Sequence, residues 1–319
     1  MKNIRFGIMG AGNIAHQFCD AVRRVDGADV VAVSSKTLEK ARIFAEKENI
    51  PSYYGNYGEM LARDDIDAVY IATTHNFHYE NMLECIANNK HILCEKCMVL
   101  NKKDAEHIFS LSKEKNLFVM EAMWVRFLPN IQKVKSWIRD GRIGSPEMAT
   151  VSIGFKANDD PNNRIYNHAL AGGSMFDIGV YMFEVMNYII GEEIKDIKTT
   201  LSLAPTGVDK AACVTVKYEN CIANLQCCVS SSVIEKAYIY GTEGTIEFPM
   251  LHWVRDCVLY DSSHKVVEVF KDCPSNGFIF EVKEVVDCIN NGKLESDIMP
   301  HRDTIQCAEL FDLILIFMI

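Results

Sequence analysis

The sequence predicts an α/β domain built on a doubly wound parallel sheet, followed by an α+β domain with a large, mostly antiparallel open sheet. Over residues 1–122 strand patterns alternate with helical patterns, which is typical of parallel strands joined by crossover helices. In residues 123–319 strand patterns follow one another with few helices between them, which favours antiparallel pairing. We expect these segments to be two domains, because 319 residues are too many for one comfortable hydrophobic core.

In the first domain, short apolar runs predict strands, and the segments between them predict helices. The strands are expected at Ile4–Met9, Asp29–Ser34, Ala68–Ala72, His91–Glu95 and Leu117–Glu121. The helices are expected at Ile14–Arg24, Leu38–Glu48, His78–Asn88 and Lys102–Lys115. Ligands of such sheets bind beyond the carboxyl ends of the strands, so the residues there are the first candidates for a functional site.

In the second domain, the sequence predicts a series of strands with helices over one face of their sheet. The strands are expected at Glu147–Phe155, Ile194–Leu203, Ala211–Tyr218, Ile222–Cys228, Lys236–Tyr240, Thr245–Phe248 and Cys257–Tyr260, and the helices at Pro129–Asp140, Gly179–Ile190 and Glu281–Asn290. Met148, Val151 and Ile153 would place apolar side chains along one strand of the open face. Burying that face against a second copy would remove an apolar patch, so we expect a homodimer through the C-terminal sheet.

Charge and composition exclude several classes of partner. The chain has 33 basic and 43 acidic side chains, a net charge of −10. A nucleic-acid or anionic-membrane surface requires a clustered excess of Lys and Arg, so neither partner is expected. The N-terminus shows no secretory signal pattern, and the most apolar tail, Leu310–Ile319, has about half the length of a bilayer span. These features predict a cytoplasmic protein.

The cysteines are scattered along the chain and do not form a framework. There are 12 of them, and Cys94 and Cys97 form a CxxC string. A zinc or redox role would require a second ligand pair or a thioredoxin-like setting, and neither occurs nearby. We therefore expect reduced thiols and no metal site.

A glycine-rich turn follows the first predicted strand and opens the first predicted helix. Gly10, Ala11, Gly12, Asn13 and Ile14, followed by Ala15, form the pattern GxGxxA. In this strand–turn–helix setting the glycines permit a tight turn and a close approach to a pyrophosphate, and the helix N-terminus supplies free N–H groups. The pattern therefore predicts a Rossmann domain that binds a dinucleotide. The alternative is a plain glycine turn.

The end of the second strand indicates which dinucleotide is bound. NAD enzymes usually carry Asp or Glu there to bind the ribose hydroxyls, whereas this chain has Ser34, Ser35 and Lys36. A hydroxyl and a cation suit a 2′-phosphate, so NADP is favoured over NAD. The alternative is that Lys36 is only solvated and that Thr37 caps the next helix.

Polar residues also follow the third strand, at the same edge of the sheet. Their hydroxyl, amide and imidazole groups could bind the ribose and phosphates of the cofactor. A helix cap is the competing role for the asparagine, and a surface imidazole is the more common role for each histidine taken alone. These candidates are Thr73, Thr74, His75, Asn76 and His78.

Five segments resemble one known family and together extend over nearly the whole chain. Glu95-Lys96 resembles the Glu-Lys-Pro motif of the glucose-fructose oxidoreductase/inositol dehydrogenase (Gfo/Idh/MocA) family. The other four segments are Glu121–Pro129, Asn163–Asn167, Ala171–Tyr181 and Gly241–Ile246. The most similar branch contains the dimeric dihydrodiol dehydrogenases and the NADP-dependent xylose dehydrogenases.

The resemblance implies roles for individual residues. Lys96 would bind the substrate hydroxyl and the nicotinamide ribose, and Asp177 and Tyr181 would act with it as the catalytic set. The cofactor side would include Glu95, Trp124 and Arg126, and the substrate side Arg164, Tyr166 and Asn167.

This set suits the oxidation of an alcohol. The hydroxyl must lose its proton as hydride leaves the carbon, and free tyrosine, with a pKa near 10, is a poor base at neutral pH. A nearby ammonium such as Lys96 would favour the phenolate of Tyr181, while Asp177 could orient the donors. Either Lys96 or Tyr181 could transfer the proton.

The resemblance implies an NAD(P)-dependent oxidoreductase that moves a hydride between the nicotinamide and a hydroxyl-bearing carbon of a sugar, polyol or diol. The alternative is a non-catalytic NADP-binding regulator with the same fold. One departure favours that alternative, because Cys97 stands where the family has proline. Proline tolerates a cis peptide bond more readily than cysteine does, so we expect reduced rather than abolished activity.

Overall fold

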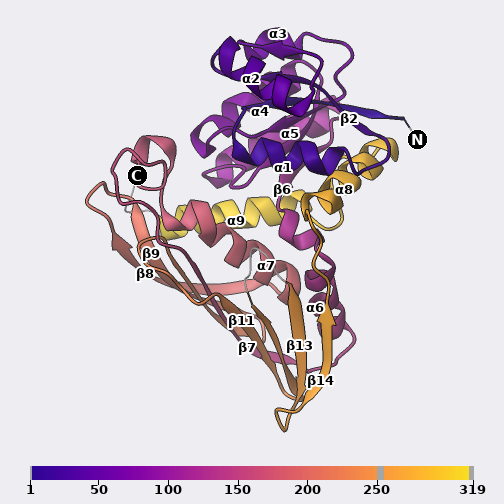
Figure 1. Ribbon diagram of the computed structural model, residues 1–319. Helices are drawn as coiled ribbons and strands as arrows, with labels where there is room; N and C mark the ends of the chain where they lie inside the picture. The colour runs from indigo at the N-terminus through magenta and orange to yellow at the C-terminus, as the bar shows by residue number, and fades with distance from the viewer. Residues whose placement is uncertain (1, 250–254, 316–319) are drawn as a thin grey trace. The chain divides into compact units, whose positions relative to one another are not determined.

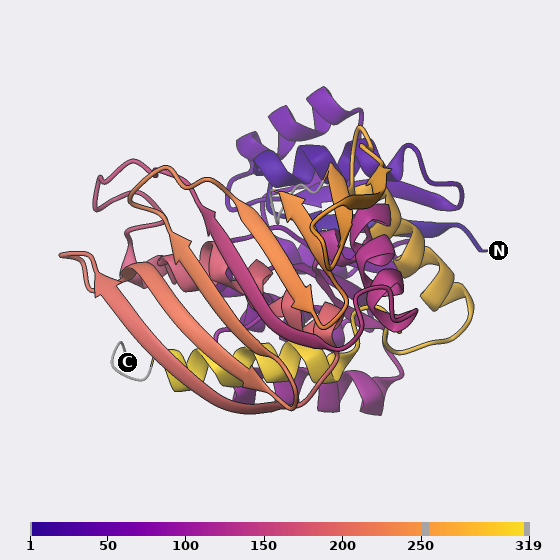
Figure 2. The ribbon, with the colours of Figure 1, turned by 90° about the horizontal axis from the view of Figure 1, so that it is seen from below.

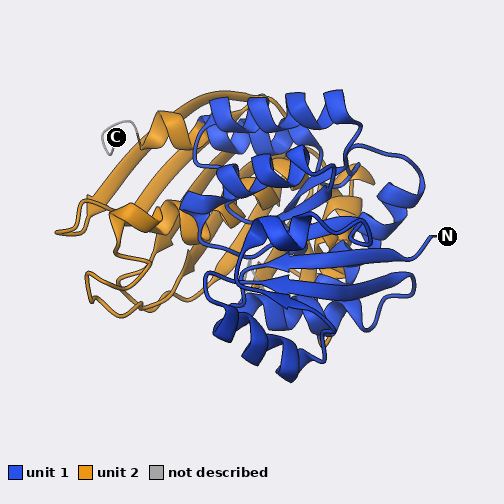
Figure 3. Ribbon diagram, turned by 90° about the horizontal axis from the view of Figure 1, so that it is seen from above, with its two compact units in different colours: residues 1–124, 276–309 blue, residues 125–275, 310–319 orange. Residues whose placement is uncertain are grey.

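The chain folds into two compact units in the computed structural model, which describes residues 2–249 and 255–315. The first unit contains residues 1–124 and 276–309, and the second contains residues 125–275 and 310–319 (Figure 3). The first boundary lies two residues beyond the expected 1–122. The expected second domain, 123–319, differs more, because 276–309 belongs to the first unit.

The first unit is built on a parallel sheet with the strand order β3-β2-β1-β4-β5-β6 (Figure 1). The strands are β1 (Ile4–Met9), β2 (Ala28–Ser34), β3 (Tyr53–Tyr54), β4 (Ala68–Ile71), β5 (His91–Glu95) and β6 (Val119–Ala122). The chain moves outward from β1 to β3 and then crosses to β4 on the other side of β1. This reversal is the point at which doubly wound sheets bind ligands, at the carboxyl ends of the strands.

Helices lie on both faces of this sheet (Figure 3). They are α1 (Asn13–Val22), α2 (Leu38–Glu48), α3 (Tyr57–Leu61), α4 (His78–Ala87) and α5 (Lys102–Lys115), with the short 3₁₀ turn η1 (His75–Phe77). A second 3₁₀ turn, η2 (Trp124–Phe127), spans the boundary between the two units. Thr37, Asn56 and Asn101 each accept a hydrogen bond from the backbone N–H three residues later, which is a standard N-cap. The sequence did not predict β3 and α3, which are too short to show a hydrophobic period.

Residues 276–309 complete the first unit because their side chains bind its helices and strands. Asn276 Nδ2 donates to the carbonyl oxygen of Gln17 (2.9 Å) and to Asp20 Oδ2 (2.8 Å) in α1. The ring of His301 stacks on Phe109 of α5, with 3.8 Å between the ring centres. The segment forms α8 (Phe278–Asn290), and α9 (His301–Ile314), which the sequence did not predict, begins in it.

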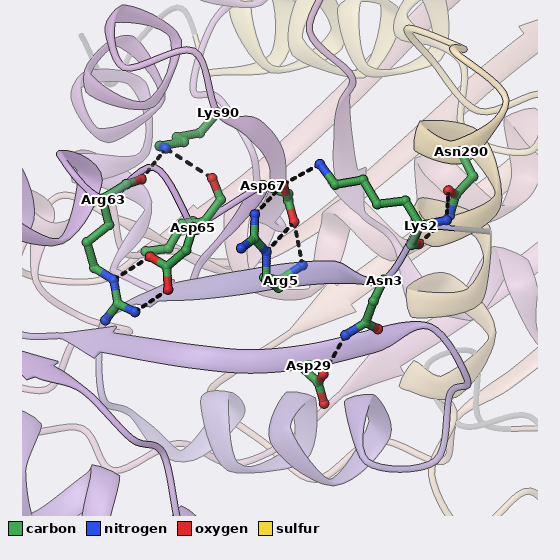
Figure 4. Close-up of polar contacts among 10 residues, drawn as sticks. Lys2, Asn3, Arg5, Asp29, Arg63, Asp65, Asp67, Lys90 and Asn290 are labelled. Carbon is green, nitrogen blue, oxygen red and sulfur yellow. Dashed lines mark hydrogen bonds and ion pairs between the residues drawn. The ribbon is translucent and has the colours of Figure 1, made fainter.

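Polar groups at the amino ends of β1 and β4 bind one another (Figure 4). Asp67 accepts hydrogen bonds from Lys2 Nζ (2.6 Å) and Arg5 Nε (3.0 Å). Burial raises the pKa of Asp67, but the hydrogen bonds from Arg5 and Lys2 outweigh it and lower the pKa to about 2. Lys90 Nζ donates to the carbonyl oxygen of Arg63 (2.6 Å) nearby. This edge is therefore an internal ion-pair network, and the carboxyl edge remains the candidate for binding.

The second unit contains the predicted, mostly antiparallel sheet, which is seen from below in Figure 2. Its order is β14-β13-β12-β11-β7-β10-β9-β8, and among the described strands of this sheet only β7 and β10 pair in parallel. The strands are β7 (Pro146–Gly154), β8 (Ile194–Leu203), β9 (Asp209–Tyr218), β10 (Ile222–Cys228), β11 (Lys236–Gly241), β12 (Gly244–Pro249), β13 (Asp256–Asp261) and β14 (Val266–Lys271). The sequence did not predict β14, an edge strand with exposed valines.

The helical elements of this unit include one irregular turn. They are α6 (Pro129–Arg139), the 3₁₀ turn η3 (His168–Leu170), the π-helical turn η4 (Met175–Gly179) and α7 (Val180–Ile190). Every residue of α7 is buried. The turn η4 leads directly into α7, which begins one residue after the expected start at Gly179. Single π turns occur frequently at functional sites. None of the helices in the described part of the chain is both long and apolar enough to cross a membrane.

The open face of the second sheet differs from the sequence prediction. Met148 is 42% exposed, whereas Val151 and Ile153 are buried. Side chains alternate between the two faces of a strand, so Met148 lies opposite to the other two, and the prediction that all three share the open face was wrong. In register, Met148 pairs instead with Ile222 of β10, which is 45% exposed, and with Tyr240 of β11.

Candidate active site

The glycine turn after β1 connects the ends of three strands. Gly10 has a φ of +100°, and a Cβ atom on it would lie 2.7 Å from the carbonyl oxygen of Ala72, just after β4. Only glycine fits this conformation and this contact. The N–H of Gly10 also donates to the carbonyl oxygen of Ser34 (2.8 Å), the last residue of β2.

The amino end of α1 is suited to an anion. Gly12 is the N-cap, and among the described residues no side chain caps the helix and no acidic residue lies in its first turn. A Cβ atom on Gly12 would meet no atom of the described residues within 4 Å, so the space beside Gly12, Ala11 and Asn13 is open in the described part of the chain. Ile14 is partly exposed, while Ala15 is buried against the sheet. Free N–H donors, the helix dipole and open space fit a pyrophosphate.

The residues after β2 have two different environments. Ser34 Oγ and the Ser35 N–H both donate to the carbonyl oxygen of Tyr54 in β3, at 3.2 Å and 3.1 Å. Lys36 is exposed, and its ammonium lies 3.9 Å from the centre of the Phe77 ring. This cation–π contact holds the positive charge at the carboxyl edge of the sheet, between β2 and η1. Of Ser34, Ser35 and Lys36, Lys36 is therefore the best placed to bind a 2′-phosphate.

His78 is buried and binds the ends of two neighbouring strands. Its Nδ1 lies 2.9 Å from the carbonyl oxygen of Cys97, and its Nε2 lies 3.0 Å from that of Thr73. Burial lowers the pKa of His78 and so favours the neutral ring. The residue is neither a surface imidazole nor an open cofactor ligand. It fixes the chain after β4 against the chain after β5.

The other polar residues after β4 are partly exposed. Thr73 Oγ1 accepts from Asn81 Nδ2 (2.9 Å), and Thr74 Oγ1 donates to Asn76 Oδ1 (2.8 Å). His75 lies beside them, in the turn η1. These hydrogen bonds fix the conformation of the loop after β4, next to the glycine turn after β1.

Glu95 and Lys96 stand at the end of β5. Glu95 is buried and accepts a hydrogen bond from the hydroxyl of Tyr70, whose ring stacks on Phe18 with 3.9 Å between centres. Burial raises the pKa of Glu95 to about 7, although the Tyr70 hydrogen bond and the Lys96 charge oppose the shift. Lys96 is half-buried, and the Lys96–Cys97 peptide is cis.

The two thiols of the CxxC string are buried. Cys97 Sγ donates to the carbonyl oxygen of Val99 (2.8 Å), and burial raises the pKa of Cys94 well above its usual range. A thiol in that state is a poor nucleophile and a poor metal ligand. Within the described residues, no group of three or more His, Cys, Asp or Glu side chains could hold a metal ion.

Two residues of α8 contribute to this region of the first unit, and the sequence did not predict either as a site residue. Phe278 stacks on Trp124, with 5.4 Å between ring centres. Glu281 is fully buried, and neither of its carboxyl oxygens has a partner among the described residues. Burial, and then the charge of Glu95, raises the pKa of Glu281 well above its usual range. Both residues lie too far along the chain from the motifs for any local pattern to reveal them.

In the second unit, the Arg126 side chain lies in the core and contacts α7. It is fully buried, Arg126 Nη2 donates to Glu184 Oε2 (2.5 Å), and the guanidinium lies 5.1 Å from the centre of the Tyr188 ring. The expected cofactor-lining role requires an accessible guanidinium, which this burial does not provide. Arg126 instead fixes α7 from within the core of the unit.

Asp177 and Tyr181 lie one turn apart at the junction of η4 and α7, so they share a face of the helix. Both are nearly buried. Arg164 Nη1 donates to Asp177 Oδ1 at 2.8 Å. The structure therefore brings together one predicted substrate residue and two predicted catalytic residues.

The other two predicted substrate residues are held by the backbone. Tyr166 is buried, and its hydroxyl donates to the carbonyl oxygen of Val229 (3.3 Å). Asn167 Oδ1 accepts from the N–H of Ala169 (3.0 Å) and caps η3. Tyr166 lines a cavity described below, whereas the side-chain oxygen of Asn167 is occupied by its hydrogen bond within the turn.

Asp209 is a functional candidate that sequence reasoning missed. It begins β9 and is fully buried, and its Oδ2 accepts hydrogen bonds from Ser174 Oγ (2.5 Å) and the Met175 N–H (2.8 Å). A Cβ atom on Gly173, whose φ is +121°, would lie 2.2 Å from Asp209 Oδ1. Asp209 thus fixes the start of η4, the turn that carries Asp177.

Comparison with protein families gives two matches. Residues 4–123 match the model described as "Oxidoreductase family, NAD-binding Rossmann fold". Residues 131–247 match the GFO/IDH/MocA C-terminal domain. Together they cover most of both units.

The chain is also similar to named relatives over nearly their whole length. It is 32% identical to trans-1,2-dihydrobenzene-1,2-diol dehydrogenase of Danio rerio, over 97% of this chain and 95% of the relative. The human enzyme of the same name is 28% identical with the same coverage.

Solved structures show the same fold. A 3-ketoreductase from Actinomadura kijaniata in complex with NADP and TDP-benzene has a TM-score of 0.89 at 21% identity, over 98% of this chain and 97% of the other. An aldose-aldose oxidoreductase from Caulobacter crescentus complexed with glycerol has a TM-score of 0.88 at 22% identity, over 98% and 96%.

Proposed function

Because the chain belongs to the GFO/IDH/MocA oxidoreductase family, we propose that it is an NADP-dependent dehydrogenase acting on a hydroxyl-bearing carbon of a sugar, polyol or diol. The observation that carries the proposal is the open amino end of α1, where no described side chain caps the helix. It lies at the carboxyl end of β1, beside β4, where the strand order of the sheet reverses. The names of its relatives, diol dehydrogenases among them, support the substrate class.

The first unit would hold the cofactor through several groups. The N–H groups of the α1 N-terminus would bind the pyrophosphate, and Lys36 the 2′-phosphate. Trp124, stacked on Phe278, would offer an aromatic surface. The bound cofactor supplies a hydride acceptor, or a donor in the reverse direction. Arg126 is left out of this set because it is buried against Glu184.

We assign the proton chemistry to Lys96 and Tyr181, and the orienting role to Asp177. A carboxylate held by Arg164 has a fixed direction in which to accept a hydrogen bond. Either Lys96 or Tyr181 can hand over the proton. The solvent isotope effect on kcat in Tyr181→Phe distinguishes them, since it persists only if the lysine is the donor.

Two measurements test the proposal. Calorimetry measures whether the folded protein binds NADPH, and absorbance of the reduced nicotinamide measures turnover with a panel of aldoses and diols. Binding with turnover supports the enzyme. Binding without turnover across the panel favours the regulator, and absence of dinucleotide binding contradicts both.

Lys36→Ala is expected to raise the KM for NADP about tenfold while changing the KM for NAD little. The reason is that one charge-assisted contact to a phosphate contributes about 1.5 kcal/mol. Steady-state kinetics with both cofactors checks this. Lys47→Ala, at the exposed end of α2, is the control and should alter neither value. An equal change in both KM values for Lys36→Ala would contradict the assignment.

We also propose a homodimer through the open face of the second sheet. Met148 and Ile222 are exposed large apolar side chains on paired strands, with Tyr240 in register beside them. Light scattering at micromolar concentration should give twice the chain mass, and Met148→Glu should give a monomer. A wild-type monomer would contradict the proposal.

For its compartment we propose the cytoplasm. All twelve cysteines are free thiols in the structure, as a reducing compartment maintains them.

A further inference from the structure

A cavity of about 300 Å³ lies within the second unit. This volume is at the lower end of the range for small-molecule sites. Its lining comes from the loop after β7, the β8–β9 turn, the start of β9 and the residues after β10. These segments converge because β7, β10 and β9 are neighbours, with Gly154 paired to Cys228 and Cys228 to Ala211 at one edge of the sheet.

The polar groups of the cavity are mostly hydrogen-bond donors. Lys156 and Lys210 both line it, and neither ammonium forms an ion pair with any residue that the structure describes. Thr206 Oγ1 is buried and has no hydrogen-bond partner among the described residues. Ser230 adds a second hydroxyl. Two ammonium groups can only donate, and a buried hydroxyl without a partner is costly, so the cavity is suited to an acceptor-rich ligand.

The charge of the lining points to an anion. Two lysines stand against one carboxylate, Asp159, in a chain whose net charge is −10. Like charges lining one cavity repel each other unless an anion lies between them. Asp159 is exposed, so solvent screens its negative charge.

The cavity is close to the proposed catalytic residues of the same unit. Tyr166 lines it, and the Tyr166 hydroxyl is fixed on Val229. Arg164, two residues earlier in the same loop, binds Asp177 at 2.8 Å. Two residues of extended chain span about 7 Å. One loop therefore contributes to the cavity and to the anchor of Asp177.

We propose that this cavity binds the phosphate of a phosphorylated sugar or polyol, with Lys156, Lys210 and Thr206 as its ligands. The inference rests on the proposed function and narrows its substrate class to phosphate monoesters. A phosphate ester offers three terminal oxygens to these donors, and its carbon chain extends toward Asp177.

The first experiment measures phosphate binding without any turnover. Inorganic phosphate is titrated by calorimetry into the full chain saturated with NADP, so that the 2′-phosphate site is already filled. Lys156→Ala and Lys210→Ala should each raise the Kd for phosphate about fivefold, a smaller factor than for a buried contact because solvent screens these lysines. The double variant should show no measurable binding. Lys265→Ala, in the exposed β13–β14 turn, is the matched control and should bind like the wild type.

The second experiment compares D-glucose 6-phosphate with D-glucose as substrates. The wild type should show a higher kcat/KM for the phosphate ester than for glucose, and Lys210→Ala should remove that advantage. Phosphate binding equal in the double variant and the wild type would overturn the subsite. So would turnover of neutral sugars without any gain from the phosphate. Phosphate binding that depends on the two lysines, with no turnover of any compound, would keep the subsite and reject the dehydrogenase.

Discussion

Replacing Lys96 with alanine is expected to lower kcat about a thousandfold and to raise the Kd for NADPH only modestly, through loss of the contact to the nicotinamide ribose. General acid–base groups contribute roughly 10²- to 10⁴-fold to turnover, and Lys96 carries the ammonium at the end of β5. The pyrophosphate contacts come from α1 and do not involve this side chain. Stopped-flow turnover and calorimetry measure the two quantities separately.

Lys103→Ala is the matched control, because Lys103 is exposed on α5 and has no assigned role. It should behave like the wild type in both assays. Lys96→Arg separates the two proton routes, since a guanidinium keeps the charge but does not release a proton at neutral pH. It should restore turnover if Tyr181 transfers the proton and fail to do so if Lys96 does. Turnover of Lys96→Ala within a few fold of the wild type would show that Lys96 is not the catalytic group.

Asp209→Ala is expected to lower kcat by about a hundredfold and the free energy of unfolding by about 3 kcal/mol. The substitution removes the acceptor of the Ser174 hydroxyl and of the Met175 N–H. Two buried donors without a partner cost roughly 1–3 kcal/mol each. Misplacement of η4 by about 1 Å would move Asp177, and such shifts cost about 10²-fold in rate. Urea denaturation and steady-state kinetics are the measurements.

Asp209→Asn separates positioning from charge. The amide oxygen can take the place of Oδ2 and keep both hydrogen bonds, so most of kcat should return. Burial raises the pKa of Asp209 to about 6, so the neutral amide also avoids burying a charge at pH 7. NADPH affinity should be unchanged in both variants, because the α1 contacts are in the first unit. A parallel loss of kcat and cofactor affinity in Asp209→Ala would indicate general unfolding instead.

Local patterns predicted the parts of the fold that depend on near neighbours in sequence. The alternation of strands and helices predicted the first sheet, and the GxGxxA pattern predicted the tight turn in which Gly10 has a positive φ. Periodicity did not reveal β3, which has two residues, or β14, whose edge position leaves valines exposed. The return of 276–309 to the first unit depends on bonds such as that of Asn276 to Gln17, 259 residues away.

The same distinction between near and distant neighbours in sequence applies to the candidate site. The positions of Lys96, Asp177 and Tyr181 follow from motifs that are continuous in sequence. The environments of His78 and Arg126 do not, because their partners, the Cys97 carbonyl and Glu184, are 19 and 58 residues away. Asp209 lies outside every motif, and only folding brings it to Ser174. Sequence motifs therefore suggest the catalytic residues, but they do not reveal the contacts that hold those residues in place.

The discontinuity of the first unit has a consequence for biosynthesis. Residues 276–309 are translated after the whole of 125–275, so α1 and α5 lack these partners until the ribosome has passed through 125–275. A nascent chain halted after residue 124 would expose the surfaces that α8 and α9 later cover. Chaperone binding to such stalled chains should therefore decrease sharply once 276–309 has left the exit tunnel.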